Sequence, residues 1–289
     1  MLACDASPLG GRVGANKLDQ ESPIHPSDDR TSVLVISDCA GDSASSEGDD
    51  VTYTIIGRCR RTRQLGIGIT TWSLGVGGYC PFVKSNVAAL SSQAAADPRL
   101  GRLAMRLLEF GYSPARVIQE LRSTDPHFEH RQIGIVDKDG NAVVHTGTST
   151  RPWTGHLTGD GYASMGNTSD SEKVVQAMAR VFEETEDLDL DERLLLSLEA
   201  GRDAGGQRAA HPESANQDRS AALIVYEFEE YALMDLRVDA HATAIQELRR
   251  VRDEYKPYIP LYYELRVKQP DKAPAQPVWF AQQRARVGP

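Results

Sequence analysis

The pattern of hydrophobic and polar positions changes sharply at Val51, where strand-like segments begin. Val51–Arg58 (VTYTIIGR) and Leu65–Trp72 (LGIGITTW) are rich in β-branched and aromatic residues, which is typical of strands, and the polar stretch between them predicts a hairpin turn. Gly66 and Gly68 fall on one face of the second strand. Glycines in a strand indicate that another backbone or a ligand approaches closely.

The next part of the chain predicts one more strand and then two helices. Asn86–Ala96 holds small residues and suits a third, closely covered strand, whereas Val76–Phe82 is typical of a loop. Leu100–Phe110 has apolar residues at helical spacing. A second helix follows, because Ser113 is a favourable N-cap and Pro114 a favourable first helical residue.

The remaining elements of this region repeat the same kinds of pattern. Alternating apolar residues around the turn sequence DKDG predict a second hairpin, Gln132–Val136 with Asn141–His145. The other expected elements are a strand near Gly161–Gly166, a helix Glu172–Glu184 capped by Ser169 to Ser171, a helix Leu190–Ala204, a hairpin Ser220–Tyr226 with Ala232–Val238, and a helix Ala242–Tyr255 broken by Pro257 and Pro260.

The order of these elements predicts the fold class. Strands joined by hairpins pair antiparallel, and helix pairs inserted between hairpins suit two packed antiparallel sheets covered by helices. We therefore predict an α+β fold, a four-layer αββα sandwich, over residues 51–255. Residues 1–50 are expected to be a poorly ordered leader or an over-extended start, and residues 256–289 a partly irregular tail, because both are poor in apolar periodicity.

Composition narrows the classes of partner. The net charge of −9 and the absence of a long basic run disfavour nucleic-acid binding, which depends on phosphate neutralisation. No apolar run approaches the roughly 18–20 residues that span a bilayer, no signal peptide is evident, and the four cysteines form no CxxC pair. We expect a cytoplasmic protein with no cofactor and no metal that acts on a small molecule; open sheet edges favour a homo-oligomer.

Candidate chemistry lies at strand ends and in loops, because the chain lacks GxGxxG, Walker A, HExxH and GxSxG motifs. Thr52 and Thr54 begin the first strand, where β-propensity alone also explains threonine. Asn167 follows a strand and precedes a helix, a place that suits an oxyanion hole. The alternative for Asn167 is an amide that satisfies its own turn.

Several further polar residues are candidates for substrate binding. His145 ends a strand, Glu199 lies near a helix C-terminus where Arg219 is a conceivable partner, and Ser220 opens a strand of small residues. For each of them a purely structural role is the alternative: a histidine bonded to a loop carbonyl, a solvated glutamate, and a residue that only begins a strand.

The segment DLRVDAH places four polar residues on one face of an extended chain. They are Asp235, Arg237, Asp239 and His241, which alternate with apolar residues. Such a face is either an ion-pair cluster or a site for a ligand or metal. It keeps open a metal-dependent hydrolase that uses Asp235, Asp239 and His241.

Taken together, these segments resemble a known family. VTYTIIGRCRRTRQLGIGITT, RQIGIVDKDGNAVVHTG, GNTSDSEKVVQAMARVFE, LEAGRDAGG, RSAALIVY and DLRVDAHATAIQELRR, in this order and spacing, are similar to domain-of-unknown-function family 1028. The resemblance covers about Val51 to Tyr255. It implies an Ntn-hydrolase-like αββα fold, in agreement with the element order, and implies a fold more firmly than a reaction.

The resemblance also implies a nucleophile. Ntn hydrolases use the first residue of the mature chain, whose own α-amino group acts as base. Thr52 occupies the place where this family usually begins Met-Thr, with Asn167 and the backbone of Gly66 to Thr70 as oxyanion candidates. Thr70, His145, Glu199, Arg219, Ser220 and Asp235 are then the expected substrate-binding residues. Met165 and Gln207 depart from the Gln and Asp that are usual in the family.

The residues ahead of Thr52 leave alternatives open. They are removed, or the chain starts at Val51 from a GTG codon, or the protein is not an Ntn catalyst. The first hypothesis is therefore an Ntn amidohydrolase for a small amide-like bond. The second is a binding or scaffold protein that kept the fold without the chemistry.

Overall fold

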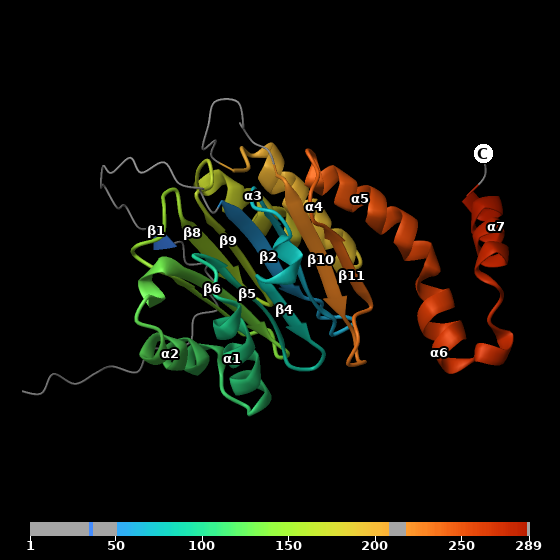
Figure 1. The fold of residues 1–289 in the computed structure, drawn as a ribbon, viewed down its shortest axis with the longest axis horizontal. Helices are drawn as coiled ribbons and strands as arrows, with labels where there is room; N and C mark the ends of the chain where they lie inside the picture. The colour runs from blue at the N-terminus through green and yellow to red at the C-terminus, as the bar shows by residue number, and fades with distance from the viewer. Residues whose placement is uncertain (1–34, 37–50, 208–217, 288–289) are drawn as a thin grey trace, which may run out of the picture. The chain divides into compact units, whose positions relative to one another are not determined.

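Two antiparallel sheets form the centre of the molecule (Figure 1). The computed structural model describes residues 35–36, 51–207 and 218–287. The first sheet has seven strands in the order β1 (Val35–Ile36), β8 (Gly155–Gly159), β9 (Tyr162–Asn167), β2 (Thr52–Arg58), β3 (Leu65–Thr71), β10 (Ser220–Tyr226) and β11 (Met234–Val238). The second has four, in the order β4 (Pro81–Lys84), β5 (Ala88–Ala94), β6 (Arg131–Asp137) and β7 (Ala142–Thr146).

The turn between β6 and β7 has the side-chain hydrogen bonds and the glycine that a tight hairpin needs. At the β6–β7 turn the Asp137 carboxylate accepts hydrogen bonds from the backbone N–H groups of Asp139 and Asn141, each at 2.9 Å. Gly140 in the same turn has φ 93°, a conformation that glycine adopts without strain. The predicted DKDG hairpin is therefore confirmed.

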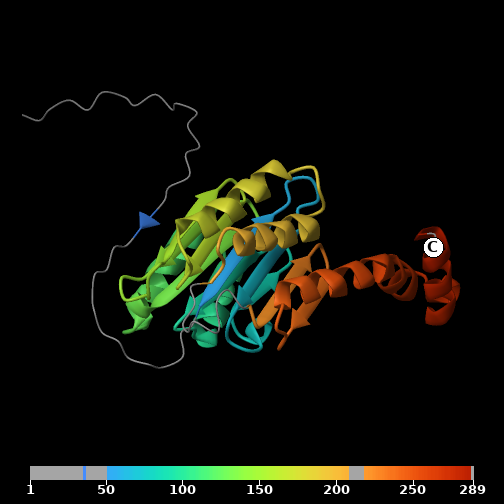
Figure 2. The same ribbon diagram turned by 90° about the horizontal axis from the view of Figure 1, so that it is seen from above.

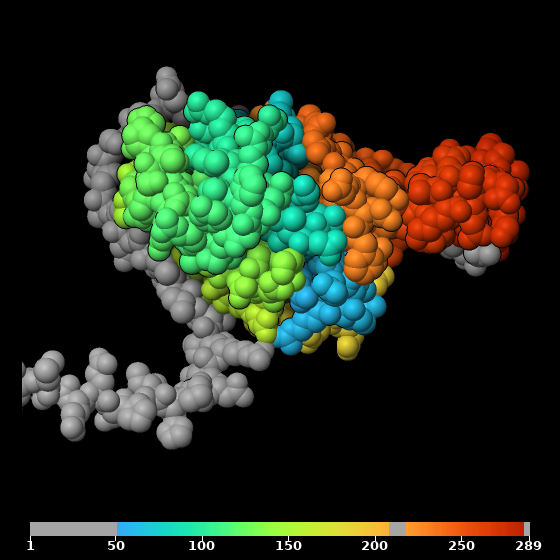
Figure 3. All heavy atoms as spheres, turned by 90° about the horizontal axis from the view of Figure 1, so that it is seen from below, coloured from blue at the N-terminus to red at the C-terminus, as the bar shows by residue number. Residues whose placement is uncertain are grey.

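Helices cover the outer face of each sheet. α1 (Pro98–Glu109) and α2 (Pro114–Thr124) lie over the four-stranded sheet and form the face seen in green in Figure 3. α3 (Glu172–Glu184), α4 (Leu190–Asp203) and α5 (Ala244–Tyr255) lie over the seven-stranded sheet, where Figure 2 shows α3 and α4 across β2. The four-layer αββα sandwich predicted from the element order is confirmed.

The strand period of two divides β2 between two environments. Tyr53 and Ile55 pack in the core beneath α3 and α4, whereas Ile56 packs between the two sheets. A Cβ atom at Gly66 would come within 2.8 Å of Leu194 of α4. The close approach predicted from the strand glycines is thus the contact with α4.

The structure departs from the sequence-based expectations in several elements. The segment 76–82, expected to be a loop, holds a 3-10 turn, η1 (Val76–Gly78), and the start of β4, and strand β8 was not predicted. Ser171 occupies the N-cap position of α3, but no side-chain hydrogen bond caps that helix. Another 3-10 turn, η2 (Phe128–His130), leads into β6.

The chain stays largely helical after α5, where a break at Pro257 and Pro260 was expected. Each proline lies in the first turn of a new helical segment, where its missing N–H has no partner to lose. The segments are η4 (Lys256–Tyr258), the π-helix η5 (Pro260–Leu265), α6 (Arg266–Lys268), η6 (Pro270–Lys272) and α7 (Gln276–Val287).

Two segments lie largely outside the described ranges. Of the expected leader 1–50, only β1 is described, and it pairs with β8. Of residues 207–218, the two ends, Gln207 and Asp218, are described. Among the described residues, no helix is long and apolar enough to cross a membrane.

Candidate functional site

A row of four buried polar residues crosses one end of the seven-stranded sheet. Asn167 of β9 lies opposite Thr52 of β2, Thr52 lies opposite Thr71 of β3, and Thr71 lies opposite Ser220 of β10. Their exposed fractions are 1%, 4%, 1% and 0% in that order. Residues that face each other across antiparallel strands share one side of the sheet. This polar row therefore faces the space between the two sheets, as Thr54 and Ile56 do.

The centre of the polar row is hydrogen-bonded to the carbonyl that precedes Thr52. The Thr52 hydroxyl donates to Thr71 Oγ1 at 3.1 Å, and the Thr71 hydroxyl donates to the Val51 carbonyl oxygen. The Trp72 N–H donates to the same oxygen at 3.3 Å. Because Val51 is only 2% exposed, this peptide group is held inside the fold.

A network of buried amides adjoins the polar row. The Thr54 hydroxyl donates to Gln93 Oε1 at 2.7 Å, and Gln93 Nε2 donates to Gln132 Oε1 at 2.9 Å. Asn167 Nδ2 donates to the same Gln132 oxygen at 3.2 Å. Strands of both sheets thus share one hydrogen-bonded network, which rigidifies the site because each partner fixes the next.

Asn167 presents an acceptor that no described residue pairs with, and its donor edge is partly engaged. One hydrogen on its Nδ2 is taken up by Gln132, while its Oδ1 is buried and has no hydrogen-bond partner among the described residues. The other oxyanion candidates, the backbone N–H groups of Gly66 to Thr70, belong to a strand paired on both sides with β2 and β10. The expected oxyanion hole at those backbone groups is not available in this arrangement.

A cavity of about 150 Å³ adjoins the Asn167 end of the polar row. Two of its lining residues, Ala94 and Thr168, have φ angles of 65° and 49°. A left-handed conformation is unfavourable for alanine and more so for a β-branched residue, and such strain clusters at functional sites. The full lining is Ala94, Ala95, His130, Ser149, Thr150, Arg151, Asn167 and Thr168, which includes two basic residues and no acidic one.

Ser220 ends the polar row with a structural contact. Its Oγ accepts from the Val76 N–H at 3.1 Å and donates to the Ser73 carbonyl at 2.7 Å. It therefore holds the segment between β3 and β4 against the sheet.

Thr70 lies on the opposite face of the sheet, turned towards α4. It donates to the Ser220 carbonyl at 3.0 Å and neighbours Asp218, to which the Tyr53 hydroxyl donates at 2.9 Å. Burial raises the pKa of Asp218 to about 6, and the hydrogen bonds from Tyr53, Gln207 and Thr70 oppose that rise. The structure thus places Thr70 among the buried donors around the Asp218 carboxyl, away from the side chain of Thr52.

His145 lies on the α2 side of the four-stranded sheet, away from the polar row. Its ring stacks on Phe128 with centroids 4.1 Å apart, and its Nε2 lies 3.1 Å from the Phe128 carbonyl oxygen. Desolvation by burial lowers its pKa, although the bond to Phe128 opposes the shift. His145 is therefore a histidine bonded to a loop carbonyl, the structural alternative.

The other predicted ligand-binding residues are scattered over the surface of the domain. Glu199 pairs with Arg249 at 2.9 Å rather than with Arg219, whose guanidinium lies 4.7 Å from the centroid of Trp72. Asp235 pairs with Arg237 at 2.7 Å. Arg219 touches the polar row through its backbone, whose N–H donates to the Thr71 carbonyl at 2.9 Å, but the described contacts of the three side chains do not reach the row.

The alternating face around Asp235 does not form a metal site. Arg237 neutralises Asp235, and His241 Nδ1 accepts from the Thr243 N–H at 3.1 Å. Within the described part of the chain, no group of three or more His, Cys, Asp or Glu side chains is placed to hold a metal ion. The geometry thus favours ion pairing along this strand.

Comparison with known proteins assigns the chain to a family. The model of a family of unknown function, DUF1028, matches residues 52–248. The chain belongs to the DUF1028 family. A crystal structure of a DUF1028 protein from Silicibacter pomeroyi is similar, with a TM-score of 0.64 and 27% sequence identity over 71% of this chain and 89% of that one. No curated protein matches the chain at a significant level.

Two more distant structures are also found. Anbu, an ancestral beta-subunit, from Yersinia bercovieri has a TM-score of 0.34 and 12% identity over 72% of this chain and 96% of that one. An Anbu Gly-1 mutant from Hyphomicrobium sp. strain MC1 has a TM-score of 0.37 and 14% identity over 71% and 94%. Scores this low carry no weight for the fold or the activity of the DUF1028 chain.

Three residues of the site were not predicted from the sequence: Thr71, which is bonded to Thr52, Gln132, which is bonded to Asn167, and Gln93, which is bonded to Gln132. One signal was present: a glutamine inside an otherwise small or apolar strand segment, as in SSQAAA and RQIGIV. Both glutamines are fully buried. Buried polar groups need partners, so such glutamines indicate a network.

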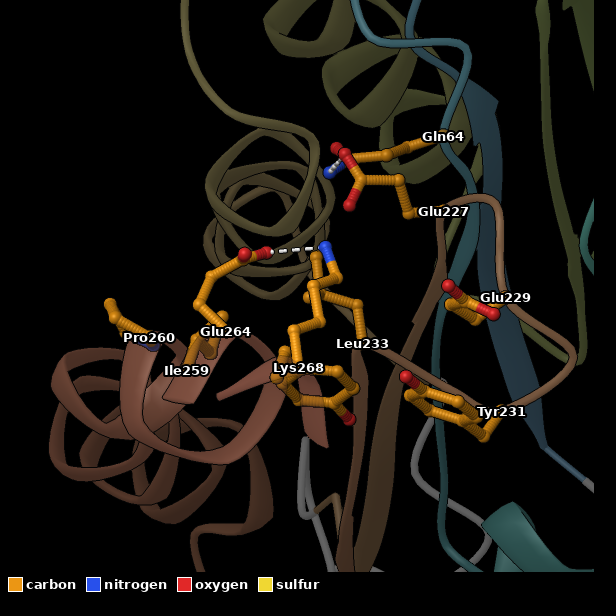
Figure 4. A pocket seen from close by; sticks show the side chains of 10 residues that line it. Gln64, Glu227, Glu229, Tyr231, Leu233, Ile259, Pro260, Glu264 and Lys268 are labelled. Carbon is orange, nitrogen blue, oxygen red and sulfur yellow. Dashed lines mark hydrogen bonds and ion pairs between the residues drawn. The ribbon is translucent and has the colours of Figure 1, made fainter. Parts of the chain in front are cut away.

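A second cavity, of about 220 Å³, lies between the β10–β11 turn and the π-helix η5 (Figure 4). Glu264 pairs with Lys268 there at 2.9 Å, and Gln64 donates to Glu227 at 3.5 Å. Its lining includes none of the predicted site residues. Three glutamates and one lysine leave this lining acidic, and we place the candidate site at the polar row because the predicted residues meet there.

Proposed function

We propose that this DUF1028 protein is an Ntn-type hydrolase of a small amide-like bond, with Thr52 as nucleophile once it is the first residue. The observation that carries the proposal is the polar row itself. It places Thr52 at the start of a central strand, facing the space between the sheets, with Thr71 and Asn167 directly opposite on the neighbouring strands. The family match also begins at Thr52.

The chemistry requires a free α-amino group on Thr52. Such an amine titrates near neutral pH and can therefore accept the hydroxyl proton as Oγ1 attacks the substrate carbonyl. The amide nitrogen leaves with that proton, and water then hydrolyses the acyl ester on Thr52. The cavity beside Asn167, about 150 Å³, suits a small substrate.

The contacts of the Val51 carbonyl suggest how Thr52 becomes the first residue. If Thr52 Oγ1 attacks this carbonyl, an Oγ1–carbon bond forms, the bond from that carbon to the Thr52 nitrogen breaks, and the hydroxyl proton moves to the nitrogen. Water then cleaves the ester. Negative charge develops on the Val51 oxygen, where the Thr71 hydroxyl and the Trp72 N–H already donate.

The same contacts support the second candidate, a binding or scaffold protein. Val51 is buried and its carbonyl is bonded to two donors, so the peptide bond to Thr52 is well accommodated in the intact chain. While that bond stands, Thr52 has no α-amine and no base.

Intact-mass measurement combined with an amide panel separates the two candidates. We expect the active protein to begin at Thr52 and Thr52→Ala to abolish turnover of small amides without unfolding the domain. Thr158→Ala, which changes a half-buried threonine on β8 of the same sheet, is the matched control and should keep activity. An active protein that retains the residues ahead of Thr52, or turnover that survives Thr52→Ala, would refute the hydrolase.

A further inference from the structure

The orientation of the Asn167 side chain is fixed by its neighbours. Gln132 Nε2 lies 3.1 Å from the carbonyl oxygens of both Gly155 and Gly166, so this atom must be the nitrogen of its amide. Gln132 Oε1 therefore turns towards Asn167 and accepts from its Nδ2. A flipped Asn167 would set two oxygens against each other.

The oxygen of Asn167 is consequently left as a buried acceptor. Asn167 is 1% exposed, and Oδ1 finds no donor among the residues that the structure describes. Leaving such a group unsatisfied is unfavourable, so its persistence calls for an explanation. A donor that is absent from the intact chain is one explanation.

Strand geometry places the Thr52 nitrogen next to Asn167. Opposed residues in an antiparallel pair either exchange both hydrogen bonds or exchange none. Because the Trp72 N–H reaches the Val51 carbonyl across the pair of Thr52 and Thr71, that pair is of the second kind. The Thr52 nitrogen therefore faces β9, opposite Asn167, in a pair that exchanges both backbone bonds, so its single N–H donates to the Asn167 backbone carbonyl.

We propose that Asn167 Oδ1 accepts a hydrogen bond from the α-amino group of Thr52 when Thr52 is the first residue of the chain. This inference rests on the proposed function. In the intact chain the Thr52 nitrogen carries one hydrogen and is acylated by Val51, whereas the free amine carries additional hydrogens. Opposed residues have Cβ atoms about 4.5–5.5 Å apart, so the Asn167 side chain lies beside Thr52. Asn167 is thus a positioning residue for the base, held in turn by Gln132.

The test compares the titration of the Thr52 α-amine in the wild-type protein, in Asn167→Leu and in Asn167→Asp. Its midpoint is read from the pH dependence of amine methylation, by mass spectrometry of the N-terminal peptide. We expect Asn167→Leu to lower the midpoint by about one pH unit, because the charged amine loses an acceptor. Asn167→Asp, which keeps the side-chain shape, should raise it, because a carboxylate favours the ammonium form.

The direction of the shift in Asn167→Leu distinguishes this role from a structural one. Both variants weaken the contact with Gln132, and a carboxylate raises the midpoint through its charge alone, so the fall in Asn167→Leu is the result that a purely structural asparagine does not predict. The acid limb of the pH–rate profile should move in the same directions as the midpoint. If the chains begin at Thr52 but the α-amine has the same titration midpoint in all three proteins, this inference is wrong and the hydrolase proposal still stands. An active chain that retains Val51 overturns both.

Discussion

Replacing Gln132 by leucine should destabilise the domain strongly, because one buried oxygen serves two donors. Gln132 is fully buried, and its Oε1 accepts from Gln93 Nε2 at 2.9 Å and from Asn167 Nδ2 at 3.2 Å. Leucine has a similar size and accepts nothing, so both donors stay buried without that partner. Each such group costs about 1–3 kcal/mol, which gives an expected loss of about 2–6 kcal/mol in the free energy of unfolding.

Urea unfolding followed by tryptophan fluorescence measures this loss. The midpoint should fall while the denaturant slope stays that of wild type, which identifies a change in stability. Gln119→Leu makes the same substitution at an exposed position of α2 and should stay within about 0.5 kcal/mol of wild type. A loss below about 1 kcal/mol for Gln132→Leu would show that the amides find other partners, and the argument for the orientation of Asn167 would fail with it.

Three further substitutions test separate parts of the structure. Thr71→Val removes a donor from the Val51 carbonyl and should slow exposure of Thr52 about 10²-fold or more in a time course of intact masses, whereas Thr71→Ser should not. Burial raises the pKa of Asp218 to about 6, so its protonated form stabilises the fold at low pH and that contribution, about 3 kcal/mol, is lost as pH rises through 6. The urea midpoint of Asp218→Asn relative to wild type should therefore increase from about pH 4 to pH 7; a constant difference would contradict the assigned titration. Glu199→Ala should cost no more than about 1 kcal/mol and leave KM unchanged, because Arg249 keeps its bonds to Glu192; a raised KM would restore Glu199 as a ligand.

Local patterns were sufficient to predict most elements of the fold. The β-branched segments became β2, β3 and β10, and Asp97 and Ser113 accept the cap bonds of α1 and α2, of which sequence analysis had singled out Ser113. The missed strands have weak local signals. β8 (GHLTG) carries two glycines and β4 begins at a proline, so their pairing depends on neighbouring strands rather than on their own propensity.

The candidate site was predictable only in part, because the register of strand pairing brings its residues together. Thr52, Asn167 and Ser220 were chosen as polar residues at strand ends. That they stand in one row depends on the pairing of β9, β2, β3 and β10, which a single sequence does not show. In the sequence Thr71 does not differ from any other threonine in a strand, and only the pairing of β2 with β3 shows that it lies opposite Thr52. Conversely, the sequence makes His145 a candidate for substrate binding, whereas its ring stacks on Phe128 and has a structural role.

The Thr71 hydroxyl links the two candidate functions, because it has a single hydrogen to donate. In the intact chain that hydrogen goes to the Val51 carbonyl, and the Thr52 hydroxyl must donate to Thr71. Removal of Val51 would release the Thr71 hydrogen, which could then turn towards Thr52 Oγ1 or a substrate oxygen. The Thr52 proton would at the same time gain an amine to accept it. In the intact chain the site thus binds the Val51 carbonyl of the same chain. Cleavage before Thr52 would supply both the base and the donor that hydrolysis needs.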